Sequence, residues 1–181
     1  MGDAPPELVL VVDFLNTRDL ESGADILMSE EETRHWLDAH GWPTLPLPST
    51  TERAHLKTLR EGVRALAVGH NGETGETEAL DGLNAVLSSI PFHLREEHGA
   101  LFLHTAARGL LGQVADLLAE ASRHPDFARL KACQNPSCRW AFYDASRNRS
   151  HRWCSMAACG SVIKSRRYRA RQKPETAPEE P

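Results

Sequence analysis

The sequence contains two cysteine pairs, Cys133-Gln-Asn-Pro-Ser-Cys138 and Cys154-Ser-Met-Ala-Ala-Cys159, which hold all four cysteines of the 181-residue chain. Zinc requires four soft ligands at tetrahedral corners, and two chelating pairs separated by a spacer of hairpin length can supply them. We therefore predict one zinc ion bound by Cys133, Cys138, Cys154 and Cys159. Four reduced structural cysteines are the alternative, and two disulfides would require an oxidising compartment.

The predicted metal has a structural role. Four thiolates close the coordination sphere of zinc, so no position remains for an activated water molecule. The binding free energy of such a site, on the order of 10 kcal/mol, helps to fold a module that is too small to depend on its own core.

The spacer between the two cysteine pairs is rich in aromatic and basic residues. Trp140, Phe142 and Trp153 favour strands and residues 146–150 favour a turn, so we expect a β-hairpin whose aromatic side chains pack over the zinc site. Asp144 is the one acidic residue in this region, and we expect it to pair with an arginine.

Charge is distributed unevenly along the chain. Residues 1–128 contain 9 Lys or Arg against 21 Asp or Glu, whereas residues 129–173 contain 12 Lys or Arg against a single Asp. This asymmetry predicts an acidic domain followed by a basic module that binds a polyanion. We expect phosphate contacts from a basic helix after the last cysteine and from the spacer turn: Lys164, Arg166, Arg167, Arg169 and Arg171 on the helix, and Arg147, Asn148, Arg149 and Arg152 on the turn.

The N-terminal part of the chain predicts an α+β fold. The β-branched run in residues 7–15 favours a buried strand. Apolar residues at three- and four-residue steps predict helices over 30–39, 52–68, 78–89 and 110–121, and a short helix begins at Pro125. Residues 92–94 and 100–104 predict a hairpin. We therefore expect a helix-rich N-terminal domain with a small β-sheet (1–126), a small zinc-binding β-hairpin/helix module (127–173) and a disordered tail (174–181).

Three polar residues follow the expected first strand. Asp13, Asn16 and Thr17 stand where side chains often face a pocket, so they are candidate ligand-binding residues. Equally, they can hold the following turn through bonds between side chain and backbone.

The residues of the cysteine region resemble the CGNR zinc-finger family of bacterial proteins. The matching positions are Cys133, Cys138, Trp140, Phe142, Asp144, Ser146-Arg147-Asn148, Arg152-Trp153-Cys154 and Cys159-Gly160. Near the N-terminus, Asp13-Phe14-Leu15-Asn16-Thr17 is similar to the Asp-Phe-x-Asn-Thr motif that opens the ABATE domain of this family. The resemblance covers about residues 8–173 and implies a transcriptional regulator with a stress- or ligand-responsive N-terminal domain. The Asn and Arg that name the family are replaced here by Ser161 and Val162, which removes one guanidinium group.

These observations together predict a cytoplasmic transcription regulator that binds double-stranded DNA and senses a small-molecule effector. A homodimer is favoured because two linked modules gain affinity through effective concentration. A module that docks an acidic protein, or one that binds RNA, is the alternative. We expect no enzymatic activity, since no nucleophile elbow, phosphate loop or dinucleotide motif occurs, and no membrane span, since no apolar run is long enough.

Overall fold

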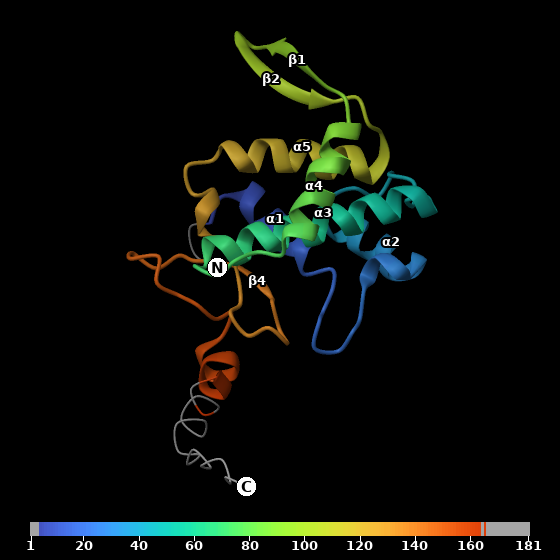
Figure 1. The fold of residues 1–181 in the computed structure, drawn as a ribbon. Helices are drawn as coiled ribbons and strands as arrows, with labels where there is room; N and C mark the ends of the chain where they lie inside the picture. The colour runs from blue at the N-terminus through green and yellow to red at the C-terminus, as the bar shows by residue number, and fades with distance from the viewer. Residues whose placement is uncertain (1–3, 164, 166–181) are drawn as a thin grey trace, which may run out of the picture.

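The computed structural model describes residues 4–163 and 165. Helices dominate the N-terminal two thirds, and two small antiparallel sheets complete a mixed α+β architecture (Figure 1). In chain order the elements are α1 (Pro6–Leu15), η1 (Ile26–Met28), α2 (Glu30–Ala39), α3 (Thr50–His70), α4 (Thr77–Ser89), β1 (Phe92–Glu97), β2 (Ala100–Thr105), α5 (Gly109–Arg123), η2 (Phe127–Arg129), β3 (Leu130–Ala132), β4 (Ala141–Tyr143) and η3 (Met156–Gly160).

Helix α3 is the central element of the fold. It begins with a capping box, in which the Ser49 hydroxyl accepts from the Glu52 amide while the Glu52 carboxylate accepts from the Ser49 amide. Its apolar stripe packs against α1, α4, α5 and β3. The core therefore lies around one helix, and the zinc region is attached to the same helix.

The expected first strand is wrong, because Pro6–Leu15 forms helix α1. Its buried residues include Leu8, Val11, Val12 and Leu15, which are three or four residues apart and so share one helical face. Pro6 occupies the first turn, where its missing N–H has no intrahelical partner to lose. Burial of this face against α3, α5 and β4 outweighs the small intrinsic preference of valine for strands.

The four longer helices expected after residue 29 are confirmed. Helix α2 has the predicted bounds, and α3, α4 and α5 extend the predicted ranges by one or two residues at one or both ends. The short helix expected from Pro125 is only the 3-10 turn η2, which begins at Phe127. Strands β1 and β2 pair from Phe92 opposite Thr105 to Glu97 opposite Ala100. His98 and Gly99 form the turn with φ values of 53° and 81°, as the tight turns of hairpins require. This hairpin extends away from the helices (Figure 1).

The hairpin expected between the cysteine pairs is wrong in its pairing. Strand β4, which contains Phe142, pairs with β3, so that Leu130 lies opposite Tyr143 and Ala132 opposite Ala141. The turn of this pair therefore contains the first cysteine pair, and residues 144–153 form an irregular segment after β4. The expected basic helix and the expected tail lie almost entirely outside the described residues.

Candidate metal centre and basic surface

The first cysteine pair lies in a tight turn between β3 and β4. Cys133 directly follows β3, and its amide donates to the Trp140 carbonyl at 2.9 Å. The Asn135 carbonyl accepts from the amides of Cys138 at 2.9 Å and of Arg139 at 3.0 Å. These bonds fold the four intervening residues back, so that both cysteine side chains reach the same point.

The second cysteine pair flanks the start of η3, a turn of π-helix: Cys154 precedes it by two residues and Cys159 lies on it. The Ser155 hydroxyl accepts from the Ala158 amide at 3.2 Å, and the Ser155 carbonyl accepts from the Gly160 amide at 3.0 Å. Asn135 connects the two pairs, since its side-chain N–H lies 3.6 Å from the Cys159 sulfur. An N–H donor beside a thiolate is typical of the surroundings of a metal site.

The four sulfurs form a cluster whose size fits zinc. All lie within 4.8 Å of one another, at 3.7 Å from Cys138 to Cys154 and 3.8 Å from Cys154 to Cys159. Zn–S bonds of about 2.3 Å at tetrahedral angles place the sulfurs about 3.8 Å apart. A disulfide would hold two sulfurs at about 2.05 Å, and all four cysteines are free. The predicted zinc site is thus confirmed as one structural ion with a closed shell of four thiolates.

The thiols of the cluster have shifted pKa values. Burial raises the pKa of the Cys138 thiol to about 11, and burial together with the neighbouring sulfurs raises the pKa of Cys154. Burial opposes ionisation of Cys159 too, but hydrogen bonds from Asn135 and the other cysteines outweigh it and lower the pKa of that thiol. A zinc ion between the sulfurs would supply the positive charge that holds all four as thiolates.

A basic loop, residues 145–152, lies beside the cysteine cluster and is built around Asp144. This carboxylate is fully buried. One of its oxygens accepts from the Ser146 amide at 3.0 Å and hydroxyl at 2.6 Å, and the other accepts from the Lys131 ammonium at 2.7 Å and the His151 amide at 3.0 Å. The expected arginine partner is wrong, because the ion pair is formed by Lys131.

Two cations hold the backbone of the basic loop from inside. The Lys131 ammonium also donates to the carbonyls of Arg149 at 2.6 Å and His151 at 3.2 Å. The Arg129 guanidinium donates to the carbonyls of Asp144 and Ser146, both at 2.9 Å. Burial alone would raise the pKa of Asp144, but the hydrogen bonds from Lys131 and Ser146 outweigh it and lower the pKa to about 2. The loop is therefore held by an ion pair whose carboxylate is ionised at neutral pH.

The loop presents its own basic side chains to solvent. Arg147, Asn148, Arg149 and Arg152 are all exposed. Arg149 lies 3.4 Å from the Asp126 carboxylate, which offsets part of its charge. The other predicted phosphate contacts, Lys164, Arg166, Arg167, Arg169 and Arg171, lie outside the described residues.

The three candidate ligand residues of α1 and its end have different surroundings. The Asn16 amide forms two bonds to β4, donating to the Ala141 carbonyl at 2.9 Å and accepting from the Ala141 amide at 2.8 Å. The Thr17 hydroxyl donates to the Phe14 carbonyl at 2.7 Å. The Asp13 carboxylate is partly exposed and lies 3.5 Å from His40. Asn16 thus joins the two parts of the chain, and ligand binding by these residues stays a prediction.

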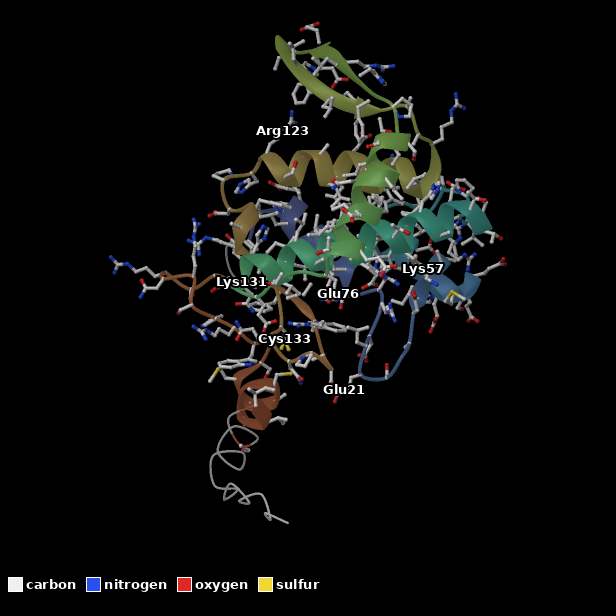
Figure 2. The ribbon with its side chains drawn as sticks, in the orientation of Figure 1. Glu21, Lys57, Glu76, Arg123, Lys131 and Cys133 are labelled. Carbon is white, nitrogen blue, oxygen red and sulfur yellow. The ribbon has the colours of Figure 1, made fainter. Side chains whose placement is uncertain are left out.

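Helix α3 ends in a set of contacts with the cysteine region that the sequence did not indicate. The Asn71 side chain donates to the carbonyls of Ala132 at 2.8 Å and Arg152 at 2.9 Å. The backbone carbonyl of Asn71 accepts from the Gln134 side-chain amide. His70 forms a bond of 2.8 Å to the Leu130 carbonyl. Lys131 and Cys133, labelled in Figure 2, consequently lie beneath the C-terminal half of α3.

Buried arginines of α3 complete this junction. Arg64 donates to the carbonyls of Leu15 and Arg139, while Arg139 forms an ion pair with Glu73. One turn earlier, Arg60 is fully buried and binds the Asp25 carboxylate through two bonds of 2.7 Å. The sequence contained a signal for this buried ion pair, because Arg60 falls on the apolar stripe of a predicted helix, where a buried charge requires a partner.

Ser161 and Val162, where the expected family residues are replaced, follow η3 directly. The Ser161 hydroxyl donates to the carbonyls of Ala157 at 2.6 Å and Ala158 at 3.0 Å, so it satisfies the end of the turn that bears Cys159. Val162 is 41% exposed. The serine therefore has a structural role, and the valine presents an apolar side chain where a cation was expected.

Two family models match the chain, one over the helical part and one over the cysteine region. The model described as "Putative stress-induced transcription regulator" (ABATE) matches residues 8–125. The chain belongs to the ABATE family. The CGNR zinc finger model matches residues 129–172. This range begins at Arg129, which binds the backbone of the basic loop, and it includes all four cysteines. No curated protein matches this ABATE protein. Among the helices that the structure describes, none is long and apolar enough to span a membrane.

Proposed function

We propose that this ABATE protein is a transcription regulator that binds double-stranded DNA through its zinc-finger part and senses an effector through its helical part. The observation that carries the proposal is the basic loop, whose exposed arginines are held by a buried ion pair next to the zinc site. Phosphate binding benefits from such a fixed loop, because less conformational entropy is lost on association.

The charge of the described surface supports a polyanionic partner. Apart from the buried Asp144, residues 129–173 contain no acidic residue, so the basic loop has little internal neutralisation. Arg147 and Arg152 take part in no ion pair among the described residues, in contrast to Arg149. The two unpaired guanidinium groups are the best candidates for phosphate contacts in this loop.

The contacts between the two parts of the chain support a regulator that transmits a signal. Asn16 binds the backbone of β4, Arg64 binds a carbonyl of the turn between β3 and β4, and Asn71 binds carbonyls of β3 and of the basic loop. A ligand that shifts α1 or α3 would therefore move the carbonyl and amide groups that position the basic loop. The proposal assigns no catalytic reaction, since four cysteines leave the zinc without an open position.

The test is fluorescence anisotropy of a labelled random duplex titrated with zinc-loaded protein at several salt concentrations. Wild type should show a linear decrease of log affinity with log salt, and Arg147→Gln with Arg152→Gln should reduce the slope by about 0.9 per lost phosphate contact. Arg95→Gln, which removes an exposed arginine of β1, is the matched control and should leave the slope unchanged.

Two results would contradict DNA binding. One is the absence of any anisotropy change at low salt; the other is an equal loss of affinity in the double variant and the control. Single-stranded RNA and an acidic peptide, titrated in parallel, report the alternative partners. Sedimentation velocity of the free protein and of the complex tests the proposed homodimer.

A further inference from the structure

A groove of about 490 Å³ lies between α1, α2 and β4, at the junction of the helical and zinc-finger parts. We call it the aromatic groove. Its walls include Asp13 of α1, Trp36 of α2 and His40 at the end of α2, and Trp140, Phe142 and Cys154 from the zinc-finger part. The groove is therefore assembled from residues more than 100 positions apart in the sequence.

Aromatic side chains form a large part of the groove lining. Trp36 is buried, at 8% exposed, and stacks on the His40 ring with centroids 4.3 Å apart. Trp140 is 38% exposed, so this side chain does not pack into a core over the zinc site as expected from the sequence. A tryptophan on the surface leaves a large apolar area in contact with water unless a ligand covers it.

Two atoms in the aromatic groove can accept hydrogen bonds from a ligand. His40 Nδ1 lies 2.7 Å from the Trp36 carbonyl, and because a carbonyl only accepts, Nδ1 donates in this contact. When the ring is neutral, Nε2 is then an acceptor, and it lies 3.5 Å from the Asp13 carboxylate. A donor group that lies beside both atoms can bind Nε2 and the carboxylate together.

Asp13 is the one acidic side chain among the described residues that line the groove, and none of them is lysine or arginine. Cys154 also belongs to the wall. Aromatic faces together with negative charge are the surroundings that select organic cations over neutral molecules.

We propose that the aromatic groove binds an organic cation, a protonated amine attached to a flat apolar group. The ammonium would lie at Asp13 and His40, and the apolar group would lie against the exposed Trp140 side chain. Binding in the groove does not depend on the proposed function. The further step, that this ligand class is the effector of the regulator, rests on the proposed function. An occupant would contact both α1 and β4, which are already joined through Asn16.

The test uses three probes of equal size and different charge: phenethylammonium, 2-phenylethanol and phenylacetate. Each is titrated into the zinc-loaded full chain without DNA, by calorimetry and by following the indole N–H signals of the tryptophans in NMR spectra. Phenethylammonium should bind about tenfold more tightly than 2-phenylethanol, because the aromatic faces and the carboxylate both favour the positive charge. Phenylacetate should bind more weakly than either.

Three variants locate the binding. Asp13→Asn keeps the shape of the side chain and should reduce the preference for the cation over the alcohol to about threefold. Trp140→Leu should weaken phenethylammonium about fivefold. Asp81→Asn, an exposed change of equal charge on α4, should leave binding within twofold of wild type. Zinc content and circular dichroism confirm that each variant is folded.

Equal binding of the three probes, or an unchanged preference in Asp13→Asn, would overturn the inference. Because these titrations contain no DNA, their failure leaves the DNA-binding proposal standing. Conversely, a cation preference in a protein that does not bind the duplex would support the groove and contradict the proposed function.

Discussion

Replacement of Asp144 by asparagine tests the ion pair that we place at the centre of the basic loop. Lowering the pKa of the carboxyl from its usual 3.8 to about 2 corresponds to about 2 kcal/mol of stabilisation of the ionised form. The variant also leaves the Lys131 ammonium buried without a counter-charge, and breaking one partner of a buried pair typically costs about 3–5 kcal/mol. We expect Asp144→Asn to lower the free energy of unfolding by about 2 to 5 kcal/mol at pH 7.

The assay is urea unfolding of zinc-saturated protein followed by circular dichroism. Lys131→Met alone should also destabilise, and the double variant should lose less than the sum of the single losses, because the two groups interact directly. The exposed Glu78→Gln on α4 is the control, expected within about 0.5 kcal/mol of wild type.

The same variant predicts a pH dependence whose sign follows from the lowered pKa. Ionised Asp144 stabilises the fold above the unfolded pKa of 3.8, and this contribution is lost as the pH falls towards the folded value of about 2. The difference in unfolding free energy between wild type and Asp144→Asn should therefore be constant above about pH 5 and narrow below about pH 4. A difference below about 1 kcal/mol at pH 7, or strictly additive single losses, would refute a stabilising pair.

Three other substitutions test the metal, the core and the junction. Cys154→Ala should reduce bound zinc below one ion per chain by elemental analysis and broaden NMR signals of residues 130–160, while residues 4–120 stay folded; full zinc content would contradict the four-cysteine site. Gly62→Ala should lower the free energy of unfolding by about 1–3 kcal/mol, because the added carbon would lie 2.4 Å from Leu83 Cβ. Gly69→Ala in the same helix has no neighbour within 4 Å of the added carbon and should raise the free energy of unfolding by about 0.5 kcal/mol. Equal melting temperatures of the two variants would disprove this contrast. Asn16→Ala removes both bonds to the β4 peptide and should cost about 1–3 kcal/mol, and hydrogen exchange at that peptide as slow as in wild type would show that the junction does not depend on it.

Elements whose signal is local were predictable from the sequence. The cysteine pairs predict the metal because residue type and short spacing together specify zinc chemistry. Helix α2 and the β1–β2 turn were predictable for a similar reason, since capping residues and residues that tolerate positive φ act on their immediate neighbours.

Errors arose where distant parts of the chain decide the outcome. The valines of α1 favour a strand locally, but the helix buries more apolar surface against α3 and α5. Strand β4 has aromatic residues on both sides in sequence, yet it pairs with β3, which precedes the first cysteine pair. In each case packing with a distant element outweighs a local preference of less than about 1 kcal/mol per residue.

The sequence by itself determined the zinc ligands, the opposite charges of the two parts and most of the helices, because each depends on residues close together in the chain. Only the tertiary structure decided that Lys131 is the partner of Asp144, that α3 holds the zinc-finger part, and that Trp140 and Asp13 line the same groove. Those arrangements bring together residues 13 to 127 positions apart, and their geometry exists only after the helices have packed.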